Sequence, residues 1–198
     1  RLRRRFPDVS DGKPPSPDTE PMADGSLLAA HAAGSAEAFD QLVERHQGRL
    51  LRFATGLLRD RTRAEDIVQE TFLRLLRKAP EIGSADSAGP WLFRVCRNLA
   101  YDLMKTESRE QLRRDRLEAV DAPTPEDQSA DAEVLALVRR EWDLLPARER
   151  EALSLKVNDG LSYAQIGEVL GVKAGTVGWI VHEAMQRLTQ RLRSAQAL

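Results

Sequence analysis

One stretch decides the fold of the C-terminal part of this 198-residue chain: Leu161-Ser-Tyr-Ala-Gln-Ile-Gly-Glu-Val-Leu-Gly-Val-Lys-Ala-Gly-Thr-Val177. Ser162 and Gln165 occupy the positions of a capping box at the start of a short helix. Gly171 is suited to the turn that ends this helix, and a longer helix is expected to follow. A capped short helix, a tight turn and a longer helix together form the layout of a helix-turn-helix.

An ordinary corner between two helices of a bundle would show a similar pattern. The small residues Ala164 and Gly167 favour the DNA-binding interpretation, because they let the two helices approach each other closely. The angle between the helices is expected to be filled by apolar side chains, namely Ile166, Val169, Leu170, Val172 and Val177.

Upstream, apolar side chains recur at steps of three and four residues, which predicts three further helices. The first buries one face, made of Phe39, Leu42, Val43, His46, Leu50, Phe53 and Leu57. The second is expected to start at a Thr62–Glu65 capping box and to bury Val68, Phe72, Leu75 and Leu76. The turn-rich segment 80–89 should end it. The third is expected over Pro90–Glu110, with an inward face of Leu92, Val95, Leu99 and Leu103.

The same periodicity predicts four short helices in the C-terminal part, over residues 132–145, 147–157, 162–170 and 174–192. Hydrophobic residues make up 41% of the chain, charged residues 31% and aromatic residues only 5%, a balance that favours helices with modest cores. The expected fold class is therefore all-α, with two small helical domains.

The net charge of −1 hides an uneven distribution along the chain. Residues 27–114 carry a net charge of +3 and residues 134–198 carry +2, whereas residues 115–133 between them carry −6. Residues 115–131 are therefore interpreted as an acidic linker that joins domains over 27–114 and 132–198. Residues 1–26, which contain five prolines, are expected to be a disordered extension.

Several classes of protein are excluded. Cys96 is the only cysteine, so neither an internal disulfide nor a cysteine-based zinc cluster can form. No apolar run reaches the roughly 18–20 residues that span a bilayer, so no membrane insertion is expected. The basic N-terminus lacks the apolar core of a secretory signal, which favours the cytoplasm. The chain has no glycine-rich phosphate loop, and its histidines, His31, His46 and His182, are too scattered for a metal or acid–base site. Neither enzymatic activity nor a cofactor is expected, and His46 is interpreted as a core residue.

Two of the predicted helices have unusual polar faces. The outward stripe of the helix 90–110 consists of Trp91, Arg94, Asn98, Tyr101, Asp102 and Lys105. Aromatic rings stack on unpaired bases and cations neutralise phosphates, so this stripe suits single-stranded nucleic acid; a solvated face with Trp91 in the core is the alternative.

The helix 64–78 aligns Asp66, Glu70, Leu73 and Arg77, with Gln69 and Arg74 alongside. A leucine among charges indicates a protein contact, unless the helix simply faces solvent.

The order of these segments resembles a known family. Ala38–His46, Ala64–Leu75 and Pro90–Asp102 resemble region two of the extracytoplasmic-function (ECF) sigma factors, and Leu145–Glu151 and Leu161–Val177 resemble region four. The resemblance spans about residues 35–110 and 132–193, with motifs on both sides of the acidic linker. It implies a sigma-type initiation factor that brings RNA polymerase to promoter DNA, with region two over 27–114 and region four over 132–198.

The resemblance also implies a role for each surface. Region two would bind the clamp helices of the polymerase β′ subunit through Asp66, Gln69, Glu70, Leu73 and Arg74. The loop 81–89, with Ile82, Ser84 and Asp86, would hold a flipped base of the −10 element. The melted −10 strand would be lined by Trp91, Arg94, Arg97, Asn98, Tyr101, Asp102 and Lys105. Region four would bind the β flap and read −35 DNA through Arg150, Ser162, Lys173, Thr176, Trp179, His182 and Arg187. The acidic linker would lie in the RNA path of the polymerase.

The last helix departs from the family pattern. Positions that are commonly basic hold Gly178, Ile180, Glu183, Met185 and Gln186, and Lys173 replaces the usual serine cap. Each missing cation removes about one phosphate contact, so affinity for −35 DNA should fall and depend less on salt. Trp179, Ile180 and Met185 either pack inward or suit a protein partner such as an anti-sigma factor.

Two other functions stay open at this point. A free-standing helix-turn-helix regulator would bind duplex DNA as a dimer, with half-sites about one helical turn apart. In a protein-interaction module, region four would mainly bind a regulator, and Ile180→Arg would be expected to abolish partner binding while sparing transcription.

Overall fold

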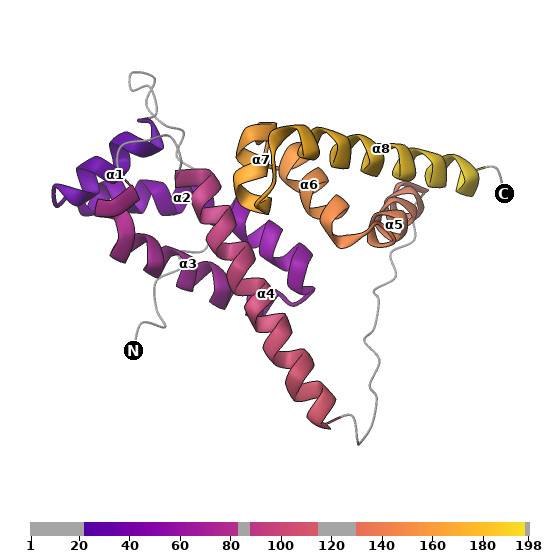
Figure 1. Cartoon of the computed structure of the whole chain (residues 1–198), viewed down its shortest axis with the longest axis horizontal. Coiled ribbons are helices and arrows are strands. Elements are labelled where there is room, and N and C mark those ends of the chain that lie inside the picture. The colour runs from indigo at the N-terminus through magenta and orange to yellow at the C-terminus, as the bar shows by residue number, and fades with distance from the viewer. Residues whose placement is uncertain (1–21, 83–87, 115–129, 197–198) are drawn as a thin grey trace.

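The computed structural model describes residues 22–82, 88–114 and 130–196, which form eight helices and no strand (Figure 1). This arrangement confirms the all-α fold class. The first four helices, here called the N-terminal bundle, are α1 (Asp24–Ala32), α2 (Ala36–Leu58), α3 (Arg61–Ile82) and α4 (Ala88–Arg114). The other four, here called the C-terminal unit, are α5 (Ala130–Asp143), α6 (Ala147–Val157), α7 (Tyr163–Leu170) and α8 (Ala174–Gln196).

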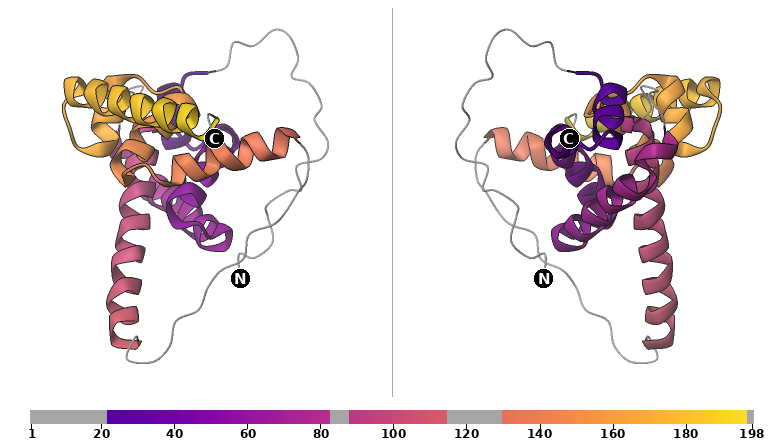
Figure 2. Two further views of the ribbon diagram at one scale, coloured as in Figure 1. Left: turned by 90° about the vertical axis from the view of Figure 1, so that its right-hand side faces the viewer. Right: turned by 90° about the vertical axis from the view of Figure 1, so that its left-hand side faces the viewer.

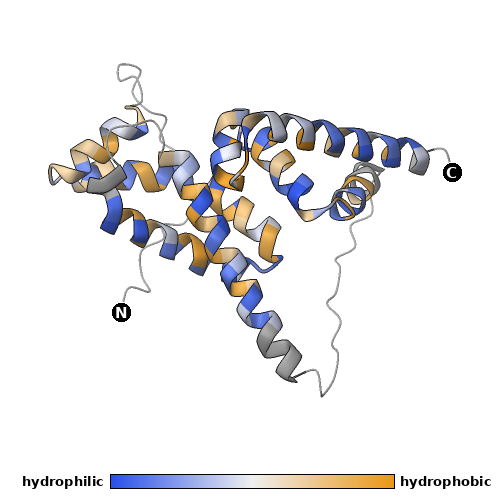
Figure 3. Ribbon diagram, viewed as in Figure 1, coloured by the Kyte–Doolittle hydropathy of each residue, from blue (hydrophilic) through white to orange (hydrophobic). Residues whose placement is uncertain are grey.

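The core of the N-terminal bundle is built on α2, which packs against α1, α3 and α4. The helix starts at Ser35, whose hydroxyl accepts a hydrogen bond from the backbone N–H of Ala38 at 3.2 Å. Hydrophilic and hydrophobic residues alternate along α2 and α3 in the way expected of amphipathic helices (Figure 3). The predicted apolar face of α2 is confirmed, with Leu42, His46, Leu50 and Phe53 buried and Phe39, Val43 and Leu57 packed at its edge.

The first helix corrects the predicted N-terminal boundary. Residues 24–26 belong to α1 and therefore to the folded bundle, not to the extension assigned to residues 1–26. Leu27 and Leu28 are buried, and the carboxylate of Asp24 accepts hydrogen bonds from Arg45 and contacts Nε2 of His46, each at 2.6 Å. His46 is confirmed as a core residue, and Asp24 is the partner that the sequence did not reveal.

Both ends of α3 differ from the prediction. Asp60, not a Thr62–Glu65 capping box, begins the helix, because its carboxylate accepts from the backbone N–H of Arg63 at 3.1 Å. The helix then continues through Pro80 to Ile82, beyond the predicted break. Leu76, expected in the core, is 40% exposed, because α3 turns only one side toward its neighbours.

The buried face of α4 is rotated relative to the predicted one. Leu92, Phe93, Cys96 and Ala100 are fully buried, whereas the expected inward residues Val95, Leu99 and Leu103 are only half-buried. The reason is that α4 is covered on two sides, by α2 and α3 and also by α7. The helix also starts two residues before Pro90 and ends at Arg114, beyond the predicted end.

A single buried thiol lies in this face. Cys96 packs in the core beside Thr71, and burial raises the pKa of the thiol to about 12, against a smaller lowering by a hydrogen bond with Thr71. The thiol is therefore protonated at neutral pH.

The C-terminal unit is organised by the predicted helix-turn-helix. Ser162 and Gln165 form both hydrogen bonds of the capping box, and Gly171 ends α7 with a left-handed backbone at φ 68°. Gly167 is required by close approach, since a Cβ at this position would lie 2.6 Å from the carbonyl oxygen of Val172. The predicted filling of the angle is confirmed, with Ile166, Val169, Leu170 and Val177 buried and Val172 packed against them.

The N-terminal bundle and the C-terminal unit pack against each other, with α7 on the first half of α4 and α6 near α2 (Figure 1). Their buried side chains belong to one continuous cluster. The last turns of α4 extend beyond the other helices (Figure 2). None of the helices in the described ranges combines the length and the apolar character needed to cross a bilayer.

Candidate nucleic-acid interface

The predicted strand-binding stripe lies along α4 and divides into two parts. Arg94, Asn98, Asp102 and Lys105 are exposed, as expected of side chains that meet a ligand. Trp91 is half-buried and packs at the edge of the core. The alternative prediction, in which Trp91 lies in the core, is therefore partly correct. The exposed part offers two cations and an amide to a nucleic-acid strand.

The second part of the stripe is covered by a carboxylate of the C-terminal unit. Arg97 Nε donates a hydrogen bond to Glu151 Oε2 at 2.5 Å, and the hydroxyl of Tyr101 donates to Glu151 Oε1. The guanidinium of Arg97 also lies 4.6 Å from the centre of the Tyr101 ring. Glu151 itself is only 2% exposed. Nothing in the local sequence pattern of α6 indicates this contact, because Glu151 lies 54 residues after Arg97 and 50 residues after Tyr101.

The same contact shifts the pKa of Tyr101. Burial, together with the hydrogen bond and the negative charge of Glu151, raises the pKa of the Tyr101 phenol to about 12, against a smaller lowering by Arg97. The hydroxyl therefore stays protonated at neutral pH and serves as a donor to the carboxylate.

The predicted pocket for a flipped base falls largely outside the described residues. Ser84 and Asp86 lie in the segment 83–87, and Ile82 is the last residue of α3. This part of the prediction stays untested.

The predicted protein-binding face lies on α3. Asp66 and Arg74 are exposed, and Gln69, Glu70 and Leu73 are half-exposed. The carboxylate of Glu70 accepts from Arg74 Nε at 3.0 Å, one turn away. The sequence interpretation missed Leu76, which lies three residues after Leu73 and is 40% exposed, so the surface offers a second apolar side chain to a partner. The sequence does carry a signal for this surface: Leu73 is an apolar residue that falls outside the regular spacing of the buried face.

Three of the residues predicted to read duplex DNA are engaged inside the C-terminal unit. Ser162 caps α7, and Arg150 donates to the backbone oxygens of Asp143 at 3.0 Å and Leu145 at 3.3 Å. Arg187 pairs with Glu183 at 3.1 Å and with Glu149 at 3.5 Å. These contacts hold the unit together, so the predicted reading surface loses two of its cations to internal partners.

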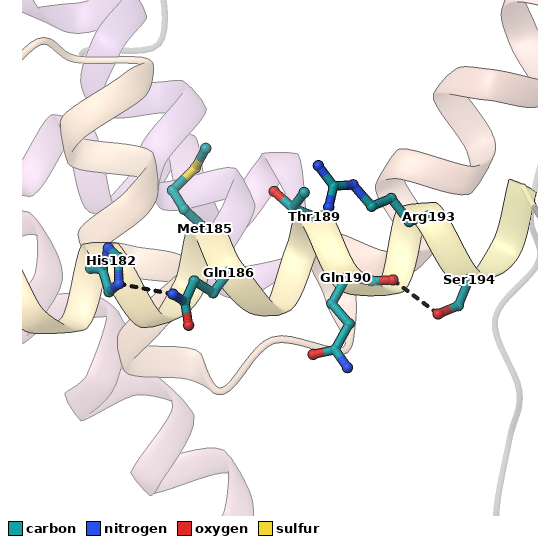
Figure 4. A pocket seen from close by; sticks show the side chains of 7 residues that line it. All are labelled: His182, Met185, Gln186, Thr189, Gln190, Arg193 and Ser194. Carbon is teal, nitrogen blue, oxygen red and sulfur yellow. Dashed lines mark hydrogen bonds between the residues drawn. The ribbon is translucent and has the colours of Figure 1, made fainter.

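The other predicted readers are exposed just before α8 and along its first turns. Lys173 and Thr176 are exposed, Trp179 is 63% exposed, and the exposed His182 accepts a hydrogen bond from the side-chain amide nitrogen of Gln186 at 3.0 Å. Met185, 46% exposed, lines a shallow hollow on the outer side of α8 with His182 and Gln186 (Figure 4).

Ile180 is buried at 4% exposure, so it cannot be part of an outer surface. The expected effect of Ile180→Arg is therefore corrected: the substitution would disrupt the core and would not test partner binding. Within the described ranges, no three or more His, Cys, Asp or Glu side chains are grouped to hold a metal ion.

Comparison with protein families agrees with this layout. Residues 42–110 match the family model "Sigma-70 region 2", which lies within α2, α3 and α4, and residues 135–188 match "Sigma-70, region 4", which spans α5 to α8. ECF RNA polymerase sigma factor SigE of Mycolicibacterium smegmatis is 34% identical over 181 residues, which cover 89% of this chain and 70% of the relative. ECF RNA polymerase sigma factor SigM of Mycobacterium tuberculosis is 32% identical over 170 residues, covering 86% of this chain and 85% of the relative.

Two solved structures share the arrangement of helices. CnrH in complex with the cytosolic domain of CnrY superposes with a TM-score of 0.66 at 26% identity, covering 87% of this chain and 99% of CnrH. The sigma factor RpoE in complex with the anti-sigma factor NepR from Bartonella quintana gives a TM-score of 0.65 at 28% identity, covering 80% and 98%. The chain therefore belongs to the ECF family of RNA polymerase sigma factors, which act in promoter recognition and transcription initiation.

Proposed function

We propose that the N-terminal bundle, which holds region 2, binds the clamp helices of core RNA polymerase through α3 and guides the melted −10 strand along α4. The contact with polymerase uses Asp66, Gln69, Glu70, Leu73 and Arg74, to which we add Leu76. The observation that carries this assignment is the exposure of two leucines among charged residues on one face of α3. Apolar side chains surrounded by charges are typical of protein contacts.

The strand contact uses the stripe on α4, with Arg94 and Lys105 for phosphates and Trp91 and Tyr101 for stacking on bases. Asn98, Arg97 and Asp102 complete it, and Ile82, Ser84 and Asp86 hold a flipped base. Capture of a base outside the stack both selects sequence and favours opening, because extruding a base costs a few kcal/mol.

In the C-terminal unit, which holds region 4, we assign α5 and α6 to the β flap and α8 to −35 DNA. Lys173, Thr176, Trp179 and His182 are the exposed readers, while Arg150, Arg187 and Ser162 support the fold. We infer weak duplex binding, because few cations remain to contact phosphates. Trp179 and Met185 suit a protein regulator, such as the anti-sigma factor in the RpoE complex.

The chain then acts without catalysis of its own and in the cytoplasm, where core polymerase and promoter DNA meet. A free-standing duplex-binding regulator is the weaker alternative, because it would have no use for the exposed apolar face of α3. Strong duplex binding by a dimer without polymerase would favour that alternative.

The test is transcription from a promoter library by core polymerase, with the full chain and with a version that ends before residue 134. Promoter-dependent transcripts are expected only with the chain present. Unchanged promoter choice without residues 134–198 would show that the C-terminal unit does not read DNA. Failure of the full chain to co-elute with core polymerase would contradict the proposal.

A further inference from the structure

In the first two turns of α8, only Thr176 and Trp179 expose a side chain larger than a methyl group. Val177, Ile180 and Val181 are buried in the core of the C-terminal unit, and the other residues of these turns are alanine or glycine. Thr176 and Trp179 are three residues apart and therefore lie on one side of the helix. In a helix-turn-helix the N-terminal residues of the second helix contact base edges, so base contact by α8 depends mainly on these two side chains.

Neither of these side chains is suited to read a base by paired hydrogen bonds. Guanine is usually read by arginine or lysine and adenine by asparagine or glutamine, whereas the methyl group of thymine is read by apolar contact. Trp179 is 63% exposed and offers an indole ring, and Thr176 offers a methyl group beside its hydroxyl. Arg187, the first arginine of α8, pairs with Glu183 at 3.1 Å and with Glu149 at 3.5 Å. The chemistry of the exposed face therefore fits thymine.

Two lysines border the start of α8 without being part of it. Tyr163 on α7 packs across the turn that carries Trp179, since a Cβ at Gly178 would lie 3.6 Å from Cε2 of the Tyr163 ring. Nζ of Lys156, on α6, lies 5.2 Å from the centre of that ring, and the exposed Lys173 directly precedes α8. Phosphate contacts are thus available from outside the helix, and such contacts carry no sequence information.

We propose that Trp179, together with the Thr176 methyl group, contacts thymine methyl groups in the major groove, so that the C-terminal unit selects duplex DNA by apolar contact. The inference rests on the proposed assignment of α8 to −35 DNA and adds the class of base that α8 selects. Met185, the other exposed apolar side chain of the described part of α8, lies six residues further along and on a different side of the helix. A protein regulator that binds Trp179 would cover the same face, so the regulator and the DNA would exclude each other.

This mode of selection has a distinct dependence on salt. Each phosphate contact releases counterions, so affinity for duplex DNA falls as the salt concentration rises. Contact between an indole and a methyl group removes apolar surface from water and involves no charge. The preference for thymine should therefore stay constant over salt concentrations that weaken binding as a whole.

The test compares two chemical forms of one duplex pool. Each duplex carries a randomised central window, made either with thymidine or with deoxyuridine, which lacks the methyl group and keeps every hydrogen-bonding group. The full chain, alone and bound to core polymerase, is mixed with the thymidine pool, and the retained duplexes are separated by gel electrophoresis and sequenced. Fluorescence anisotropy then gives the affinity for enriched duplexes in both forms.

We expect thymine to be enriched in the window. Exchange of one enriched thymine for uracil should weaken binding about fourfold, which is the effect of removing one methyl group from an apolar contact. The factor should be the same at about 50 and about 200 mM salt. Trp179→Ala should weaken binding and abolish the difference between the two forms, and Thr176→Ser, which keeps the hydroxyl, should reduce it. Met185→Ala is the matched control and should preserve the difference.

The absence of thymine enrichment, or equal affinity for the thymidine and deoxyuridine forms, would overturn the proposal. A difference that persists in Trp179→Ala would assign the methyl contact to another residue and would overturn it too. Because Trp179 is 63% exposed, its replacement should leave the helices intact, which circular dichroism checks.

Methylated cytosine gives an independent measurement. Exchange of an enriched thymine for cytosine should weaken binding, and 5-methylcytosine at the same position should recover about the factor that is lost with uracil. No recovery would mean that hydrogen bonds, and not the methyl group, select thymine. Co-elution with core polymerase separates the two proposals: its failure refutes the proposed function, whereas equal binding of both pool forms by a chain that co-elutes refutes methyl contact alone.

Discussion

Two aspartates, Asp24 and Asp159, show how the surroundings of a carboxylate decide its charge. Burial raises the pKa of both groups. At Asp24 the hydrogen bonds and charges of His46 and Arg45, both at 2.6 Å, outweigh burial and lower the pKa below its usual value. At Asp159 the ion pair with Arg49 is longer, at 3.5 Å, and the pKa stays raised. The ionised form of Asp24 therefore stabilises the fold, while that of Asp159 costs free energy.

Asp24→Asn should destabilise the N-terminal bundle by about 1–3 kcal/mol at pH 7, because a charged acceptor of two hydrogen bonds is lost. A carboxyl group whose pKa is lowered by folding stabilises above its unfolded pKa, here 3.8, and loses that effect as pH falls through the lower folded value. Urea unfolding should show a difference between the two chains that narrows below about pH 3.8. Asp40→Asn, on the exposed side of α2, is the control and should change little.

At the scale of elements, the helix-turn-helix depends on one close approach. Gly167→Ala should destabilise the C-terminal unit by about 1–3 kcal/mol, since its Cβ would meet the Val172 carbonyl oxygen at 2.6 Å. Gly175→Ala is the matched control, because nothing lies within 4 Å of a Cβ there, and alanine should be neutral or stabilising in a helix. Thermal unfolding of both variants checks this. Equal stability of the two would mean that the backbones can move apart at no cost.

A second prediction at this scale concerns binding of core polymerase to the exposed face of α3. Leu76→Asp should weaken binding to core polymerase by about tenfold or more, because an exposed apolar contact would be replaced by a desolvated charge. The urea midpoint should stay close to that of the unsubstituted chain, since Leu76 is 40% exposed. Binding is measured by fluorescence anisotropy of the labelled chain. Undiminished affinity would remove Leu76 from the interface.

Local features were predictable from the sequence, and contacts between distant residues were not. The capping box of Ser162 and Gln165 and the left-handed Gly171 follow from residues within one turn, so propensity alone identifies them. Asp60 as the start of α3 was missed because Thr62 and Glu65 imitate a better cap. The rotated face of α4 and the contact of Glu151 with Tyr101 depend on how the two parts pack, which no local pattern encodes.

For the whole molecule, exposed and buried ion pairs between the two parts should contribute differently to the free energy of unfolding. Arg59 and Asp143 also join them, at 2.8 Å, but their side chains are 61% and 50% exposed. Exposed pairs contribute about 0–1 kcal/mol, so Asp143→Asn should leave the free energy of unfolding nearly unchanged. Urea unfolding of the full chain checks this. A clear loss of stability on this substitution would show that the exposed pair holds the two parts together.

The buried thiol of Cys96 makes it simple to measure how the two parts are arranged in solution. Thiolate is the reactive form, and a pKa of about 12 leaves almost none of it at neutral pH. A cysteine introduced at an exposed site would then be the one thiol in the chain that takes up a maleimide dye. A pair of such sites, one on α2 and one on α8, would report the distance between the two parts as energy transfer in single molecules, with the native core left intact.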